Sequence, residues 1–405
     1  MSGDGPLAGV KVLDLMWVMA GPAASRVLAD YGAIVVHVES TKRIDTARTM
    51  APFLGGVAGP ENSALFQSLN AGKYGVTLDL SSEQGREVAL DLVRWADVVM
   101  ESFSPKAMRA WGLDYQSLRA IKPELIMLST CLMGQTGPLA GFAGFGSLAS
   151  AISGFHNLTG WPDRPPAGPF GAYTDTFAPR FTAAAVLAAL EYRRRTGRGQ
   201  YLDQSQAEAS LHFLAPALLD YTTNGRVLGP LGNRDPAMAP HGVYPAAEEE
   251  RWVAIAVEGD AQWRSLCDLM GRSELAAEAR FATATGRLAC QDELDGIVAS
   301  WTRGRSAREL EALLQSRGVA ASAVESSSDL SEDEQLRQRD LLVDVEHEVH
   351  GTIPVEGSRL RLSDTPAVID RAAPTFGRDN HFVLRELLGY GEERIAELVA
   401  AGALE

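Results

Sequence analysis

The sequence predicts an α/β protein with a large Rossmann-like domain, built around a parallel sheet, and a smaller α+β domain. Strand and helix patterns alternate up to Ser129, which is typical of a parallel sheet covered by helices. Near Asn224–Arg234 the composition shifts to Gly, Pro and Asn, which indicates a linker before a second domain. A chain of 405 residues is also longer than one ordinary hydrophobic core usually supports.

The first elements form a βαβ unit: a β-rich run at Val10–Leu15, a helical pattern at Ala23–Tyr31 and a buried strand at Ala33–Glu39. A right-handed crossover makes two such strands parallel neighbours. The pattern repeats with a strand at Gly75–Leu80, a helix at Glu83–Trp95, and strands at Asp97–Glu101 and Glu124–Ser129. Because such sheets bind ligands at the carboxyl ends of their strands, the candidate binding loops are Trp17–Pro22, Glu39–Arg48 and Glu101–Pro105.

The later part of the chain changes character. Gly134–Gly171 is rich in Gly, Pro and aromatic residues, which is typical of a segment that lines a site. An alanine-rich helix is predicted at Pro179–Arg195, and TGRGQ breaks it before a strand at YLDQS and a helix at Gln206–Tyr221. Val243–Val257 reads as a hairpin with an acidic turn, followed by three helical patterns. These elements predict the smaller α+β domain.

Composition and charge exclude several classes of protein. The net charge is −15 with no sustained basic run, which argues against nucleic acid or an anionic membrane as partner. Three widely spaced cysteines without a CxxC pattern predict free thiols in a reducing compartment. The N-terminus does not resemble a secretory signal, and no apolar run reaches the roughly 18–20 residues of a membrane span. We therefore expect a cytoplasmic protein.

Common cofactor motifs are missing from the sequence. The turn after the first strand reads WVMAGPAAS and lacks the glycine fingerprint of dinucleotide-binding folds, so the sheet alone does not predict NAD. The string HEVH places His347 and His350 three residues apart, without a third ligand nearby in sequence. We therefore expect no metal site and a solvated histidine pair.

One acid, Asp175, lies among aromatic and small residues in GAYTDTFAPRF, just before the alanine-rich helix. Asp175 and its neighbours Thr174 and Thr176 all suit a helix N-cap, and Pro179 suits a first turn. The same carboxylate, at a positive helix end with few competing donors, is also suited to act as a general base or a nucleophile. Taken alone, these residues favour capping, although the two roles are compatible.

Several long strings resemble the family III CoA-transferases, the group of formyl-CoA transferase and carnitine CoA-transferase. They are PLAGVKVLDLMWVMAGPAASRVLADYGAIVVHVE, LNAGKYGVTLDLSSEQGREVALDLVRWADVVMESF and TDTFAPRFTAAAVLAALEYRRRTGRGQYLDQSQAEA, with later matches at GNRDPAMAPHGVYPA and LRELLGY. The resemblance implies transfer of CoA from an acyl-CoA to a free carboxylic acid, with no tightly bound cofactor. It assigns Asp175 as the nucleophile, which forms a mixed anhydride and then an aspartyl-CoA thioester. It also implies an interlocked dimer and domains at 1–225, 226–325 and 326–405, the last returning to the large domain.

The resemblance also assigns positions in the CoA cleft. They are Val18, Met19, Ala20, Arg48, Leu69, Lys73, Ser102, Phe103 and Arg109. The chain departs from the family at three places: His37 replaces a basic residue, SFSPK replaces Asn-Phe-Arg-Pro-Gly, and Met19 replaces a glutamine. The loss of that amide donor argues against an oxalate/formyl pair and predicts that backbone N–H groups stabilise the anhydride instead.

The resemblance leaves alternatives for the reaction and the partner. The related α-methylacyl-CoA racemases carry a catalytic histidine where this chain reads Gly144–Phe145–Gly146, so proton exchange is disfavoured. Some family members need a second homologous subunit. GFGSLASAISGFHNLTGWPDRPP and GNRDP–APHGVYP are most similar to the succinyl-CoA-dependent branch, which includes benzylsuccinate CoA-transferase of anaerobic toluene degradation. We expect succinyl-CoA as donor and an aromatic dicarboxylate as acceptor, with Arg180 or Arg164 binding its distal carboxylate. His241 is expected to be a hydrogen-bonded histidine rather than a site residue.

Overall fold

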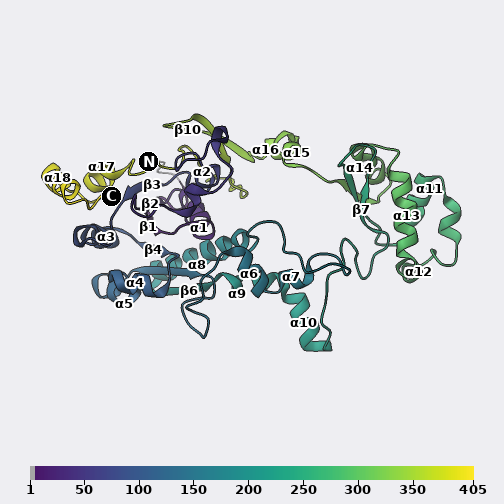
Figure 1. Ribbon diagram of the computed structural model, residues 1–405, viewed down its shortest axis with the longest axis horizontal. Helices are drawn as coiled ribbons and strands as arrows, with labels where there is room; N and C mark the ends of the chain where they lie inside the picture. Colours follow the sequence, from purple (N-terminus) through teal and green to yellow (C-terminus); the bar gives the residue numbers. More distant parts are fainter. Residues whose placement is uncertain (1–4) are drawn as a thin grey trace. The chain divides into compact units, whose positions relative to one another are not determined.

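The computed structural model describes residues 5–405, which divide into two compact units (Figure 1). The first contains the described residues up to His156 together with Gly168–Val227 and Glu334–Glu405. The second contains Asn157–Ala167 and Leu228–Asp333. The chain thus leaves the first unit twice, and the short segment Asn157–Ala167, which the sequence placed in the large domain, belongs to the smaller unit.

The first unit is built on a six-stranded sheet in which all neighbouring strands are parallel, as the alternating pattern predicts. The strands are β1 (Lys11–Leu15), β2 (Ile34–Glu39), β3 (Tyr74–Thr77), β4 (Val98–Glu101), β5 (Ile126–Cys131) and β6 (Tyr201–Ser205). Their order is β3-β2-β1-β4-β5-β6, so the winding direction reverses between β1 and β4. In open α/β sheets such a reversal opens a crevice at the carboxyl ends of the two strands.

Helices cover both faces of this sheet because successive strand residues point to opposite sides. Leu13 and Leu15 pack with the helices α3 (Glu83–Trp95), α5 (Tyr115–Ile121) and α18 (Glu392–Ala400), and Figure 1 shows α18 beside α3. Val12 and Met16 face the other side, where α1 (Ala20–Asp30) and α8 (Thr174–Thr196) pack together. The C-terminal segment therefore completes the core of the first unit.

Local signals in the sequence explain where the helices begin and end. The Ser82 side chain caps α3 by accepting a hydrogen bond from the backbone N–H of Gly85. Gly197 ends α8 in the left-handed conformation, with φ of 71°. Gly199 follows in close contact with the preceding strand, since a Cβ there would lie 2.1 Å from the Leu125 carbonyl oxygen. The TGRGQ string thus stops the helix and lets the chain approach β5.

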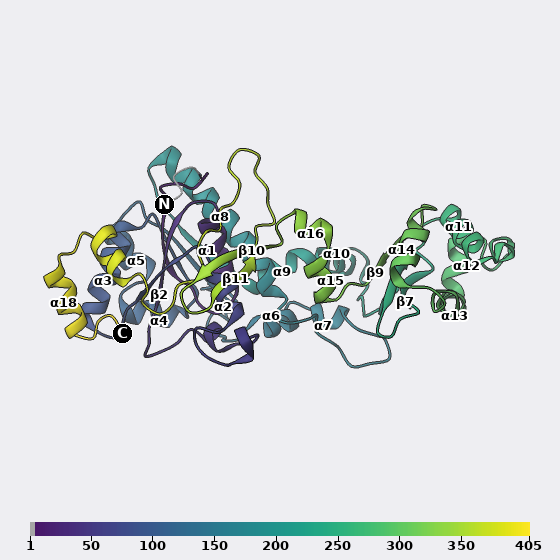
Figure 2. The same ribbon diagram turned by 90° about the horizontal axis from the view of Figure 1, so that it is seen from above.

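The remaining elements of the first unit surround these layers. They are η1 (Thr46–Thr49), η2 (Leu54–Gly56), α2 (Ala64–Asn70), α4 (Pro105–Trp111), α6 (Gly146–Ile152), α9 (Gln206–Leu211), η3 (His212–Leu214), α10 (Ala215–Asn224), α16 (Glu334–Gln338), α17 (Asn380–Phe382) and η5 (Val383–Leu387). An antiparallel hairpin, β10 (Leu342–His347) and β11 (Gly351–Glu356), is seen well in Figure 2. The short helix α7 (Phe155–Leu158) spans the first boundary between the units.

The second unit is an α+β structure, as predicted. Its antiparallel sheet contains β7 (His241–Pro245), β8 (Trp252–Ala256) and β9 (Ala320–Ala323), and an acidic turn joins the first two strands. The helices are α11 (Asp260–Met270), η4 (Ser273–Ala277), α12 (Ala284–Ala289), α13 (Gln291–Thr302), α14 (Ala307–Gln315) and α15 (Ser327–Glu332). Trp263 and Phe281 are at most 1% exposed and lie in its core.

Among residues 5–405, no helix is both long enough and apolar enough to span a membrane.

Candidate active site

Helix α8 carries Asp175 to the carboxyl edge of the parallel sheet. The helix leads directly into β6, and its last turn lies at the opposite edge, where Arg193 Nη2 is 2.9 Å from Asp97 Oδ1, just before β4. The first turn of α8 must therefore lie at the edge where the strands end. The loops that follow β1 and β4 lie at this same edge.

The helix begins five residues earlier than Pro179, the start that the sequence predicted. Tyr173 precedes its first turn and makes no side-chain cap, and Asp175 lies inside that turn. The capping interpretation of Asp175 is therefore wrong. Pro179 is an interior helix residue, and because it has no N–H it cannot donate to the carbonyl of Asp175 four residues before it.

Asp175 is held by a short network of neutral groups. The Gln206 Nε2 amide, at the start of α9, donates to Asp175 Oδ1 and also to Thr174 Oγ1, at 2.9 Å. The Thr174 hydroxyl in turn donates to the Gly146 carbonyl oxygen at 3.0 Å. Gly146 is crowded against the acid, since a Cβ there would lie 2.4 Å from Asp175 Oδ1. Sequence reasoning missed Gln206, although its position directly after a parallel strand places it at this edge.

The environment of Asp175 disfavours its charge. Asp175 is 7% exposed, and among residues 5–405 it forms no ion pair. Burial raises its pKa to about 6, and the hydrogen bond from Gln206 only partly opposes this effect. At neutral pH the carboxylate is thus mostly ionised but poorly solvated, which is the condition of a reactive nucleophile.

Aromatic rings surround the start of α8. Tyr173 and Phe177 pack edge to face with ring centroids 4.5 Å apart, and Phe177 stacks on Phe213 at 4.0 Å. Phe155, from the glycine- and aromatic-rich segment, meets Tyr173 at 5.5 Å. Tyr173 and Phe177, four residues apart, share one face of α8, so these rings form a single aromatic cluster at the start of the helix.

The loops after β1 and β4 meet at the reversal of the strand order. The Trp17 backbone N–H donates to Ser102 Oγ at 3.0 Å, and the Trp17 ring packs edge to face on Phe103 at 5.1 Å. Val18 has φ of 72°, a conformation rare for a β-branched residue, and its N–H donates to Asp45 Oδ1 at 2.9 Å. Met19 and Ala20 follow at the start of α1. The structure thus brings together five of the positions assigned to the CoA cleft, namely Val18, Met19, Ala20, Ser102 and Phe103.

The two buried cations of the predicted CoA cleft are bound to protein groups. Arg48 is fully buried, and its five N–H groups reach the Glu39 carboxylate, Glu61 Oε2 and the carbonyls of Pro60 and Pro374. Lys73 is fully buried as well and donates to Asp14 Oδ2, Asn70 Oδ1 and the Pro22 carbonyl. Both cations therefore hold the loops from within.

The other two positions predicted for the CoA cleft, Leu69 and Arg109, are more exposed than Arg48 and Lys73. Leu69 is half-buried on α2. Arg109 is exposed on α4, the helix that follows the β4 loop. Arg109 is thus a cation of this region that solvent reaches.

Two histidine clusters bear on the question of metals. His37, Glu39 and Asp45 offer ligand atoms that all lie within 4.8 Å of one another, a group that sequence reasoning did not identify. Both Glu39 oxygens, however, accept hydrogen bonds from Arg48. His347 is 3% exposed rather than solvated, and its Nε2 lies 3.0 Å from Gln67 Nε2. Glu39 and His347 thus already have protein partners.

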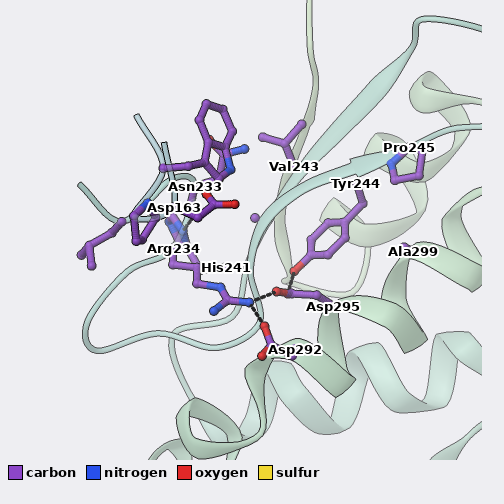
Figure 3. A pocket seen from close by; sticks show the side chains of 14 residues that line it. Asp163, Asn233, Arg234, His241, Val243, Tyr244, Pro245, Asp292, Asp295 and Ala299 are labelled. Atoms are coloured by element: carbon purple, nitrogen blue, oxygen red, sulfur yellow. Dashed lines mark hydrogen bonds and ion pairs between the residues drawn. The ribbon is translucent and has the colours of Figure 1, made fainter. Parts of the chain in front are cut away.

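The second unit has its own cavity, of about 560 Å³, which Figure 3 shows from close by. Arg234 pairs with Asp292 and with Asp295, and the Tyr244 hydroxyl donates to Asp295 Oδ1 at 2.8 Å. His241 Nδ1 lies 2.7 Å from the Asn233 carbonyl oxygen, which makes it a hydrogen-bonded histidine. The charges of Arg234, Asp292 and Asp295 are therefore paired with one another.

Comparison with known proteins identifies the family of the chain. Residues 7–380 match the model of CoA-transferase family III. The chain is 35% identical over 384 residues to succinate–glutarate CoA-transferase of Agrobacterium fabrum, covering 94% of the chain and 96% of that protein. It is 34% identical over 395 residues to succinyl-CoA–D-citramalate CoA-transferase of Chloroflexus aurantiacus, covering 98% of the chain and 97% of that protein.

A solved structure gives the same result for the fold. The crystal structure of a CAIB/BAIF family protein from Brucella suis has a TM-score of 0.87 and 33% identity, and the match covers 95% of the chain and 100% of that protein. The chain belongs to CoA-transferase family III, and it is a CoA-transferase.

The raised pKa of Asp175 predicts a stability change that depends on pH. The pKa is 3.8 ordinarily and about 6 when folded, so ionisation of Asp175 lowers the stability as pH rises from about 4. The cost is fully present above about pH 6. Asp175→Asn keeps an oxygen for Gln206 but no charge, and we expect it to be more stable than the parent at pH 7.5 by about 2–3 kcal/mol.

The measurement is urea unfolding at pH 7.5 and at pH 4, where the difference should shrink. The exposed Asp364→Asn is the matched control and should show little effect at either pH. Equal stability of the parent and Asp175→Asn at pH 7.5 would contradict the burial of a charged Asp175.

Proposed function

We propose that the protein transfers CoA from succinyl-CoA to a dicarboxylic acid, with Asp175 as the nucleophile. The observation that carries this proposal is a buried carboxylate with a raised pKa and an amide donor, at the carboxyl edge of a parallel sheet. Two relatives support the choice of substrates, since their names pair CoA transfer with succinate or succinyl-CoA and a dicarboxylic acid.

The reaction proceeds through two covalent states of Asp175. The carboxylate attacks the succinyl-CoA thioester carbon, the C–S bond breaks, and CoA leaves as a thiolate from a mixed anhydride. The thiolate then attacks Cγ of Asp175, which releases succinate and leaves an aspartyl-CoA thioester. The acceptor acid takes CoA by the same steps in reverse. Because both intermediates hydrolyse easily, the burial of Asp175, which is 7% exposed, has a chemical purpose.

A racemase-like reaction is a weaker alternative. Proton exchange at an α-carbon needs a second acid or base opposite the first. Within residues 5–405, the side-chain hydrogen bond to Asp175 comes from the neutral Gln206 amide, and Gly146 leaves no side chain where it faces the acid. Nucleophilic transfer therefore fits these neighbours better.

We propose that CoA binds over the loops after β1 and β4. Val18, Met19, Ala20, Ser102 and Phe103 would contact the cofactor-like substrate directly, because they lie together at the reversal of the strand order. These loops would be supported from the protein interior by Arg48, Lys73 and Leu69. Arg109 is exposed and offers a cation to a CoA phosphate. CoA is a substrate in this scheme, and no tightly bound cofactor is needed.

The nucleophile is tested by trapping the enzyme during the reaction. With succinyl-CoA and borohydride, the aspartyl thioester should be reduced and the modified peptide should contain Asp175. Asp175→Asn should lower the transfer rate by at least about 10³-fold, because the attacking oxygen is lost. Transfer at the parental rate by Asp175→Asn, or a modification on another peptide, would refute the mechanism.

We propose a dicarboxylate as the acceptor, and (R)-benzylsuccinate is one candidate. With that acceptor, this chain would be the catalytic subunit of a benzylsuccinate CoA-transferase. We propose that Arg180 binds the distal carboxylate. It is exposed on α8, five residues from Asp175, and donates to the Thr176 carbonyl.

A panel of acceptors tests this assignment. Glutarate, citramalate and (R)-benzylsuccinate should react faster than the monocarboxylate valerate, and oxalate should react poorly. Arg180→Met should raise the KM for the dicarboxylate about 10-fold, through loss of one charge-assisted hydrogen bond, with little change in kcat. Arg164→Met, in the second unit, is the comparison variant. An unchanged KM in Arg180→Met together with a raised one in Arg164→Met would transfer the role to Arg164.

We propose further that the chain works with a second chain, either an identical copy in an interlocked dimer or a homologous subunit. On α10, Leu218, Leu219 and Tyr221 are 56%, 61% and 56% exposed, which is unusual for a surface facing water.

Three free cysteines are consistent with a reducing, cytoplasmic location.

Light scattering tests the assembly. The purified chain should have about twice its mass of 43.4 kDa, and Leu219→Glu should reduce it to a monomer by placing a charge on the apolar surface. An active parent at 43.4 kDa would exclude the need for any second chain. A dimer without activity that becomes active on addition of a homologous subunit would favour the heteromer.

A further inference from the structure

The Gln206 side chain is fixed by its neighbours in a single orientation. The Thr174 hydroxyl donates its proton to the Gly146 carbonyl oxygen. Its oxygen can therefore only accept a hydrogen bond from Gln206. The group that faces both Thr174 Oγ1 and the Asp175 carboxylate must therefore be the NH₂ of the amide. Gln206 is 8% exposed, so water competes little for these two protons. One N–H of the amide is thus directed at Asp175 Oδ1.

From this arrangement we infer that Gln206 is the oxyanion donor for the steps in which Cγ of Asp175 is attacked. The inference builds on the proposed role of Asp175 as the nucleophile. It also replaces the expectation that backbone N–H groups compensate for Met19. The compensating amide comes instead from the residue that follows β6.

The two carboxylate oxygens of Asp175 have different roles in this scheme. Oδ1 is bound by Gln206 and lies on the side where a Cβ at Gly146 would come within 2.4 Å. Oδ2 is the oxygen left to attack the thioester carbon. The electron pair of Oδ2 forms the new C–O bond, the C–S bond breaks, and CoA leaves as the thiolate. In the anhydride that results, Oδ1 is the carbonyl oxygen of Asp175.

Gln206 is needed most in the next step. The CoA thiolate adds to Cγ, and the electron pair of the C=O bond moves onto Oδ1, which becomes an oxyanion. The Gln206 N–H stabilises this charge, since a buried donor pre-aligned on an oxyanion contributes more than a donor in water. The intermediate collapses as the Cγ–Oδ2 bond breaks, and succinate departs with Oδ2. The acceptor carboxylate supplies a new oxygen when it attacks Cγ of the thioester in the return half.

A neutral amide suits this task better than a cation. A lysine or arginine at the same place would also stabilise the resting carboxylate and so weaken the nucleophile, because only interactions that strengthen in the transition state speed the reaction. With the amide, the pKa of Asp175 still lies at about 6. Gln206 thus discriminates between the resting carboxylate and the oxyanion better than a charge would.

The test compares two glutamines on the same strand end. Gln206→Met keeps the length of the side chain and removes the donor. Gln204→Met is the matched control, because Gln204 Nε2 donates to the Ala178 carbonyl of the same helix, 3.1 Å away, and accepts from Thr182 rather than contacting Asp175. Circular dichroism and thermal melting confirm that both variants are folded.

Three readouts are measured with succinyl-CoA and the best acceptor. For Gln206→Met we expect kcat to fall by about 10²–10³-fold, the loss typical of one oxyanion donor, with the KM for succinyl-CoA within a few-fold of the parent. Single-turnover formation of the borohydride-reducible aspartyl thioester should slow equally. The acid limb of the kcat/KM profile should move to higher pH, because Gln206 lowers the pKa of Asp175. Gln204→Met should keep the parental pH profile.

A further variant separates hydrogen bonding from shape. Gln206→Glu donates only while its carboxyl is protonated, so its activity relative to the parent should rise as pH falls. Parental kcat and an unshifted acid limb in Gln206→Met would overturn the inference, as would equal effects of the two methionine variants. If Asp175→Asn is inactive while Gln206→Met is fully active, only the role of Gln206 fails. If Asp175→Asn remains active, the proposed function itself fails.

Discussion

The buried ion pair between Lys73 and Asp14 holds the edge of the sheet on which the site is built. Both side chains are fully buried, and Lys73 Nζ lies 2.9 Å from Asp14 Oδ2. The Lys73 ammonium also donates to the Pro22 carbonyl oxygen in α1 and to Asn70 Oδ1 at the end of α2. One side chain thus connects a strand and two helices. Burial alone would raise the pKa of Asp14, but Lys73, His37 and Ser25 outweigh it and keep this pKa well below its usual range. Removing either partner would leave a buried charge uncompensated, at a cost of about 3–5 kcal/mol.

A second set of buried charges continues this support beneath the candidate CoA loops. Arg48 binds Glu39 at the end of β2 and Glu61 near α2, and its guanidinium lies 3.7 Å from the centre of the Phe66 ring. Asp45, just before η1, accepts the Val18 N–H and so fixes the strained turn after β1. These charged side chains hold the backbone in place from the protein interior. The surface of the candidate CoA loops is left to main-chain groups, aromatic rings and exposed cations such as Arg109.

The sequence predicts the sheet well because each of its signals is local. Alternating runs such as Val10–Leu15 and Ala33–Glu39 are recognised within a few residues, and β1 and β2 occur there. The sequence pattern places the start of α8 at Pro179 because proline is common in a first turn. The helix begins at Thr174 instead, where Thr174 and Asp175 make tertiary hydrogen bonds. The contact between Gln206 and Asp175 joins residues 31 apart in sequence, across a helix and a strand. Such a contact exists only once the fold is known.

Asp14 and Asp175 show how one residue type acquires opposite properties in the same unit. Both are almost fully buried, so desolvation acts against both charges. Asp14 faces an ammonium and a hydroxyl, which lower its pKa and make it a permanent, unreactive anion. Within residues 5–405, Asp175 accepts a side-chain hydrogen bond from the Gln206 amide and forms no ion pair, so its charge is only partly compensated and its pKa rises to about 6. Because a fully paired carboxylate is a poor nucleophile, the raised pKa of Asp175 and the nucleophilic role proposed for it have the same origin.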